Sequence, residues 1–131
     1  MQKLVVLLTF LLSASILAAQ PLSGDAFEDY TNGKTLYFSE GGEAYGAERY
    51  LPGRRVEWSF LDGKCKSGDW YADGPSICFV YEDRPEPQCW QFEATANGLR
   101  ATFLGEEQST ELYEATQSDK PMYCIGPDVG V

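Results

Sequence analysis

The stretch that decides the fold is residues 92–103, which read Phe-Glu-Ala-Thr-Ala-Asn-Gly-Leu-Arg-Ala-Thr-Phe. Apolar and polar residues alternate on both sides of Asn97-Gly98, a dipeptide that favours a two-residue turn between antiparallel strands. A turn centred there pairs Ala96 with Leu99, Ala94 with Ala101 and Phe92 with Phe103. All six residues are apolar, so the pattern predicts a β-hairpin with one buried face.

Three further turn dipeptides, Pro52-Gly53, Asp62-Gly63 and Asp73-Gly74, separate similar alternating runs. A turn at Asp73-Gly74 pairs Trp70 with Ile77 on the core side and Asp69 with Cys78 on the other. In residues 56–60 the even positions are apolar, which predicts a strand with Val56, Trp58 and Phe60 facing inward.

The turn at Asp62-Gly63 creates a conflict of phase. It places Cys65 opposite Phe60 on the core face, yet Trp70, an odd number of positions further along, also has to face inward. A β-bulge at Ser67-Gly68 would restore the phase.

Residues 35–39, 44–51, 79–82, 88–93 and 111–115 supply further strands, which gives about eight antiparallel strands in an up-and-down meander. We expect an all-β fold whose sheet closes into a small barrel, because closure removes the exposed edges. A β-sandwich is the alternative, since alternation does not distinguish closure from stacking. Ser23 is expected to cap a short helix over residues 25–30 that ends before Gly33 and lies across an open end of the barrel.

Residues 1–19 have the parts of a signal peptide. Lys3 precedes an apolar run of about 16 residues, shorter than the roughly 20 that a membrane-spanning helix needs, and small residues end it at Ala18-Ala19. We expect cleavage after Ala19, which leaves residues 20–131 as a single β-barrel domain with no membrane insertion. The mature protein is then periplasmic or secreted.

Charge and composition exclude several classes of function. The chain has 20 Asp and Glu against 10 Lys and Arg, so it repels nucleic-acid phosphate, and any partner should be neutral or cationic. The favoured interpretation is that the acidity only maintains solubility. It has no His, which excludes Ser-His-Asp and Cys-His catalysis. Carboxylate chemistry remains, and its candidates are Glu40, Glu43, Glu48, Asp69 and Asp73. Among so many acidic residues some pair approaches by chance, so we expect no enzyme, no catalytic residue and no cofactor.

The four cysteines predict two disulfides in an oxidising compartment. Cys78 and Cys89 fall on the faces opposite to the core residues of two neighbouring strands, which favours a Cys78–Cys89 bridge. Cys65–Cys124 is then the second bridge and ties the C-terminal tail to the barrel. A zinc site is not expected, because the chain has neither His nor a Cys-x-x-Cys pair.

Aromatic residues crowd the first six strands, where they can either fill the barrel or leave a slot for an apolar or flat ligand. Filling is the simpler expectation. If a slot exists, the candidate ligand-binding residues are Tyr37, Trp58, Trp70, Tyr81 and Arg55. Arg49, Arg54 and Arg55 form a basic island that could pair with a carboxylate ligand, although neutralising neighbours such as Glu48 and Glu57 is the favoured interpretation.

Several short motifs resemble small uncharacterised periplasmic proteins of alphaproteobacteria over residues 22–104. They are Leu22-Ser23-Gly24, Gly33-Lys34-Thr35-Leu36, Tyr45-Gly46-Ala47-Glu48, Arg54-Arg55-Val56-Glu57-Trp58, Cys65-x-x-Gly68-x-Trp70-Tyr71, Ile77-Cys78-Phe79-Val80-Tyr81 and Cys89-Trp90-x-Phe92. The resemblance implies a barrel similar to the calycins, which include the lipocalins. In lipocalins the Gly-x-Trp signature lies on the first strand, whereas Gly68-Asp69-Trp70 is mid-chain. No binding residue is therefore carried over.

Two functions remain as expectations. The first is a non-catalytic periplasmic binding module that holds a small apolar or aromatic ligand. The second is an acidic protein–protein module that inhibits a cationic envelope hydrolase such as lysozyme, to which the negative charge would steer it. Residues 40–48 could supply the carboxylate-bearing rim loop that such an inhibitor needs.

Overall fold

A computed structural model describes residues 20–105 and 110–125 of the chain. The predicted signal peptide, residues 1–19, lies outside the described residues. The described part has one short helix, α1 (Gly24–Thr31), followed by eight strands. These are β1 (Thr35–Glu40), β2 (Glu43–Leu51), β3 (Arg55–Ser59), β4 (Lys66–Asp73), β5 (Ser76–Tyr81), β6 (Gln88–Thr95), β7 (Gly98–Phe103) and β8 (Glu111–Ser118).

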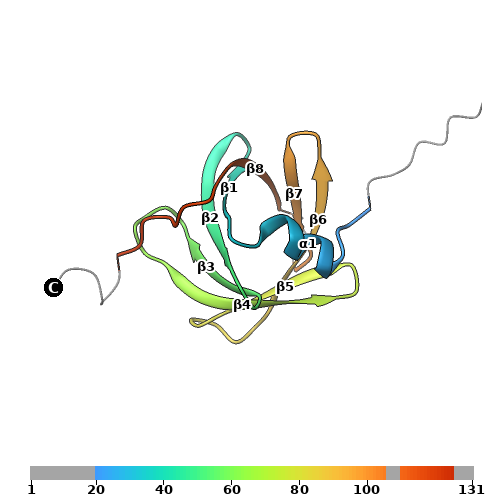
Figure 1. The fold of residues 1–131 in the computed structure, drawn as a ribbon, viewed down its shortest axis with the longest axis horizontal. Helices are drawn as coiled ribbons and strands as arrows, with labels where there is room; N and C mark the ends of the chain where they lie inside the picture. The colour runs from blue at the N-terminus through green and yellow to red at the C-terminus, as the bar shows by residue number, and fades with distance from the viewer. Residues whose placement is uncertain (1–19, 106–109, 126–131) are drawn as a thin grey trace, which may run out of the picture.

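The strands form a closed antiparallel barrel. Each strand pairs with the next along the chain, and β8 pairs with β1 to complete the ring, which Figure 1 shows from one end. The predicted up-and-down meander is confirmed, and the β-sandwich alternative is wrong. Closure gives the first and last strands hydrogen-bonding partners that the edges of a sandwich would lack.

The hairpin faces are as predicted, but the register of two hairpins differs by two residues. Thr95 pairs with Gly98 across a turn at Ala96-Asn97, and consequently Phe92 stands opposite Ala101. In the same way Trp70 pairs with Phe79, because the turn lies at Gly74-Pro75. A shift by two keeps each side chain on its own face, so Phe92, Leu99 and Ala101 are buried as predicted. Ala94 and Ala96, predicted to share that face, are exposed near the turn.

The predicted bulge at Ser67-Gly68 is wrong, and the β3–β4 connection explains why. Trp58 pairs with Lys66, and the register continues without a shift to Arg55 opposite Asp69. The connection around Asp62-Gly63 is longer than a two-residue turn and includes Leu61 at a φ of 64°. Its length sets the phase, so Trp70 faces the core without a bulge and Cys65 falls outside the ladder.

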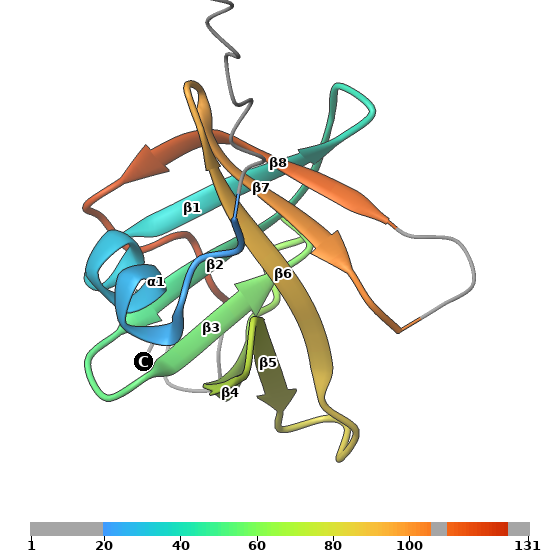
Figure 2. The ribbon, with the colours of Figure 1, turned by 90° about the vertical axis from the view of Figure 1, so that its right-hand side faces the viewer.

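Helix α1 closes one end of the barrel, as predicted. The Ser23 side chain accepts a hydrogen bond from the backbone of Ala26, and Gly33 beyond the helix has a φ of 80°. Figure 2 shows α1 lying at the end of the barrel from which β1 starts. Phe27 points from this helix into the barrel and is fully buried.

Both predicted disulfides are present. Cys78 and Cys89 are direct partners on β5 and β6, with their Cα atoms 4.0 Å apart, and Cys65 bonds to Cys124. No cysteine of the chain is free. Two disulfides are typical of a protein that matures in an oxidising extracytoplasmic compartment. Within residues 20–105 and 110–125, no helix combines the length and apolar character needed to cross a membrane.

Candidate ligand-binding cavity

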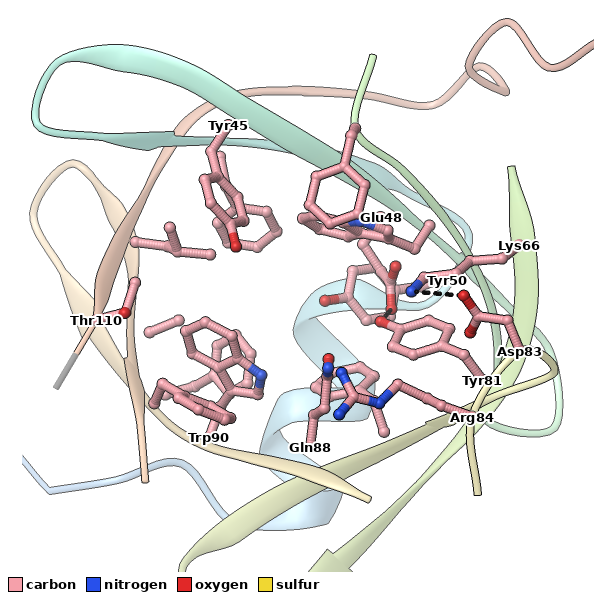
Figure 3. Close-up of a pocket in the computed structure, with 18 residues that line it drawn as sticks. Tyr45, Glu48, Tyr50, Lys66, Tyr81, Asp83, Arg84, Gln88, Trp90 and Thr110 are labelled. Carbon is pink, nitrogen blue, oxygen red and sulfur yellow. Dashed lines mark hydrogen bonds and ion pairs between the residues drawn. The ribbon is translucent and has the colours of Figure 1, made fainter. Parts of the chain in front are cut away.

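The barrel contains a cavity of about 570 Å³, which lies within the usual range for small-molecule sites. Figure 3 shows side chains from the barrel strands converging on it, with α1 behind. Its wall is largely aromatic, and the rings are those of Phe38, Tyr45, Tyr50, Trp58, Phe60, Phe79, Tyr81, Trp90, Phe92 and Phe103. The simpler expectation of a filled interior is therefore wrong for this part of the barrel.

The two tryptophans of the wall come from different sides of the ring of strands. Trp58 on β3 packs edge-on against Phe60 and lies beside Gly46 on β2, where an added Cβ would overlap the indole ring. Trp90 on β6 packs against Phe103 on β7, with ring centroids 4.9 Å apart. Because Gly46 has no side chain, it leaves room for the indole ring of Trp58. The alternation of strand residues points both tryptophan rings inward.

The floor of the cavity is set by the closing helix. Phe27 of α1 contacts the rings of Tyr50, Phe79 and Phe92 at centroid distances of 5.5, 6.4 and 4.5 Å. Those three rings also line the cavity, whereas Phe27 itself does not. The helix therefore fills one end of the barrel and leaves the space beyond these rings open.

A single carboxyl group, that of Glu48 on β2, is buried in the cavity wall and is only 2% exposed. Its Oε1 accepts a hydrogen bond of 2.8 Å from the hydroxyl of Tyr81. Its Oε2 is buried and has no hydrogen-bond partner among the described residues. A buried carboxyl oxygen without a partner is costly, which makes it a candidate for contact with a ligand.

Burial raises the pKa of Glu48 to about 8, although the hydrogen bond from Tyr81 and the charge of Lys66 act to lower it. Burial and the charge of Glu48 also raise the pKa of Tyr50 and of Tyr81 well above their usual range. Both phenols stay protonated as a result. At neutral pH the Glu48 carboxyl is mostly neutral as well.

Charged side chains line one edge of the cavity. Lys66 Nζ lies 3.3 Å from the carboxylate of Asp83 and 4.7 Å from the ring centre of Tyr81 (Figure 3). Arg84 follows Asp83 and also lines the cavity. The ion pair with Asp83 partly neutralises the charge of Lys66. Among the described residues, Lys66 makes no salt bridge to Glu48.

The structure brings together two of the five candidate ligand-binding residues. Trp58 and Tyr81 both line the cavity. Trp70 is buried nearer the helix, against Phe27 at 5.1 Å, and Tyr37 stands between the inward-facing Leu36 and Phe38. Tyr37, Trp70 and Arg55 are therefore not part of the cavity wall.

The basic island neutralises neighbouring acids, but not all the predicted ones. Arg49 pairs with Glu57 at 3.7 Å, and Arg54 pairs with Glu28 at 2.9 Å. The predicted neutralisation of Glu48 is wrong, because Glu48 and Arg49 are adjacent on a strand and point to opposite faces. Arg55 is exposed, and its Nε donates a weak hydrogen bond of 3.4 Å to the carbonyl of Pro52.

Glu48 is the residue whose importance sequence reasoning missed, although it was among the candidate carboxylates. Its position two residues before the buried Tyr50 puts both side chains on the inward face of one strand, and that phase is the signal that could have identified it. The other candidates, Glu40, Glu43, Asp69 and Asp73, do not line the cavity. Among the residues described, no group of three or more His, Cys, Asp or Glu could hold a metal ion.

Comparisons with protein-family models, with curated proteins and with solved structures find no match to this chain. The closed antiparallel barrel of eight strands is consistent with a calycin-like fold. Fold alone does not specify function, so a functional argument has to rest on the cavity itself.

Proposed function

We propose that this protein is an exported, non-catalytic binding module of the periplasm that holds a small apolar or aromatic ligand inside its barrel. The observation that carries the proposal is the aromatic cavity of about 570 Å³. Ligand sites are concave, mostly apolar and provided with a few polar groups, and this cavity has all three properties. The resemblance to small periplasmic proteins of alphaproteobacteria and the two disulfides support an extracytoplasmic location.

The aromatic wall favours a flat ligand over a long flexible one. Trp58 and Trp90 each offer a ring at a different part of the wall, and a planar molecule can contact both at low entropic cost. The buried carboxyl group of Glu48 would orient the ligand more than it would raise the affinity. The chain has no His to act as a catalytic base, so the proposal is one of binding without reaction.

The test is a titration of residues 20–131 with the neutral flat dye N-phenylnaphthylamine, whose fluorescence rises in apolar surroundings. We expect one dye per chain and quenching of tryptophan emission, because two of the three tryptophans line the cavity. Neutral aromatic compounds and fatty acids are then ranked by how well they displace the dye. Absence of saturable binding would contradict the proposal.

A pair of variants on β7 locates the dye. Ala101 lines the cavity, so Ala101→Phe fills it and is expected to weaken dye binding at least tenfold. Thr102 is the next residue on the strand and does not line the cavity, so Thr102→Phe adds the same ring without filling it. Equal binding by both variants, with the barrel intact by circular dichroism, would place the dye outside the cavity.

Inhibition of a cationic envelope hydrolase such as lysozyme remains the second candidate. The exposed turn between β1 and β2, with Glu40 opposite Glu43, supports it as a carboxylate-bearing rim. Titration with lysozyme at low and high salt tests this function separately. A salt-sensitive complex that leaves dye binding unchanged would favour the rim over the cavity.

A further inference from the structure

The free oxygen of Glu48 is the one feature of the cavity that points to a particular ligand chemistry. Oε1 already accepts the Tyr81 hydroxyl, whereas Oε2 is buried without a partner among the described residues. Glu48 lines the cavity, and Figure 3 shows it between Tyr50 and the ring of Tyr81. A ligand N–H in the cavity would therefore supply the missing hydrogen bond.

We propose that the cavity selects flat aromatic ligands that carry a cationic N–H group, an amidine or a primary ammonium, and that this group donates to Oε2 of Glu48. The proposal rests on the proposed function and specifies its ligand class. Two further observations support a cation over a neutral or anionic group: the aromatic rings near the carboxyl, and the net negative charge of the chain.

Aromatic rings line the cavity near the position that the cation would occupy. Tyr50, Trp58 and Tyr81 line the cavity beside Glu48, and ring faces attract cations most strongly where water is excluded. The wall already contains such contacts, since Lys66 Nζ lies 4.7 Å from the ring centre of Tyr81 and 5.7 Å from that of Phe60. The net charge of −10 would also draw cationic ligands toward the protein.

The groups that face Glu48 determine how the site responds to pH. They are Tyr50 on the same strand, Lys66 on β4, Tyr81 on β5, and Asp83, which pairs with Lys66. Burial dominates and raises the pKa of Glu48 to about 8, so the carboxylate form becomes populated only as the pH rises toward that value. A cationic ligand binds the carboxylate, and its affinity therefore rises with pH. The chain has no His that would titrate in the same range.

The experiment compares three flat probes of the same shape: benzamidine, which stays cationic throughout the range, benzamide, which is neutral, and benzoate, which is anionic. The affinity of each probe is measured by its ability to displace N-phenylnaphthylamine from residues 20–131 between about pH 6 and about pH 9. We expect benzamidine affinity to rise about tenfold for each pH unit below about 8 and then to level off, and benzamide affinity to stay constant. Benzoate should bind most weakly.

Three variants separate the carboxyl group from its surroundings. Glu48→Gln should abolish the pH dependence and weaken benzamidine at least tenfold at about pH 9, while benzamide binding stays unchanged. Tyr81→Phe removes a hydrogen bond that lowers the pKa of Glu48, so benzamidine affinity should level off at a higher pH. Glu57→Gln removes the same charge from a residue outside the cavity, one that pairs with Arg49, and should behave as the parent protein.

The outcomes distinguish this proposal from the proposed function. If the dye binds but benzamidine and benzamide compete equally at every pH, the cavity binds ligands and the selection by Glu48 is wrong. If benzamidine binding depends on pH equally in the parent protein and in Glu48→Gln, another group is responsible and the proposal is likewise overturned. If the dye itself does not bind, the proposed function fails first.

Discussion

Aromatic side chains fill one end of the barrel and line an open cavity toward the other. At the end closed by α1, Phe27 is fully buried among the rings of Tyr50, Trp70, Phe79 and Phe92. Beyond those rings, Tyr45, Trp58, Phe60, Trp90 and Phe103 surround an open cavity. Phe27 from α1 fills the closed end, so the filling of this barrel depends on the helix as well as on the aromatic residues of its strands.

The largest expected effect comes from removing that side chain. Phe27→Ala should lower the free energy of unfolding by about 3–5 kcal/mol, because it leaves a hole among four rings. Phe60→Ala, at a ring that is 56% exposed at the cavity, should cost less than about 1 kcal/mol. Urea denaturation of both variants measures the contrast, and equal losses would show that the two ends do not differ in this way.

The Cys65–Cys124 disulfide gives the next effect. Cys65–Cys124 joins residues 59 apart in sequence and ties the tail to the loop before β4, so Cys65→Ser with Cys124→Ser should cost about 2–4 kcal/mol. Cys78–Cys89 spans only 11 residues and constrains the unfolded chain less. Unchanged stability in the Cys65/Cys124 double variant would show that packing alone holds this region.

The buried carboxyl makes the cavity region sensitive to pH. The folded pKa of Glu48 is about 8, above its ordinary value of 4.5, so its contribution to stability is fully present below about pH 4.5 and is lost as the pH rises through about 8. Between about pH 5 and about pH 7, the parent protein should lose roughly 2 kcal/mol that Glu48→Gln keeps. Parallel stability curves for the two proteins would mean that Glu48 is ionised in the folded state at the acidic end of this range.

The smallest expected effect on stability comes from Arg54, which holds helix α1 against the barrel. Arg54 pairs with Glu28 at 2.9 Å and lies 4.5 Å from the ring centre of Trp70, so Arg54→Ala should cost about 1 kcal/mol, less at high salt. Arg55 makes no ion pair among the described residues and serves as the matched control. If Arg55→Ala destabilises the protein as much as Arg54→Ala, the ion pair does not hold the helix.

The sequence was sufficient for the barrel because strand alternation is a local property. The alternating residues of 92–103 give the correct inward face even though the turn lies at Ala96-Asn97, since a shift by two residues preserves the face. The same parity placed Cys78 beside Cys89. Both predictions need only the phase of a strand and the order of neighbours.

The cavity could not be predicted in the same way, because it depends on depth along the barrel axis. Trp58 and Trp70 both face inward, yet only Trp58 lines the cavity, while Trp70 is covered by Phe27. In the sequence, Glu48 is likewise one acidic residue among many. Only the structure shows that it is buried. Alternation predicts which face of a strand a side chain lies on, but it does not predict how far that side chain lies from helix α1.

A crystal structure of residues 20–131 with N-phenylnaphthylamine bound tests the central claim most directly. The account predicts one dye molecule inside the barrel, in contact with Trp58 and Trp90 and beyond the floor formed over Phe27. A dye bound on the outer surface, or wall residues collapsed to fill the space, would contradict it.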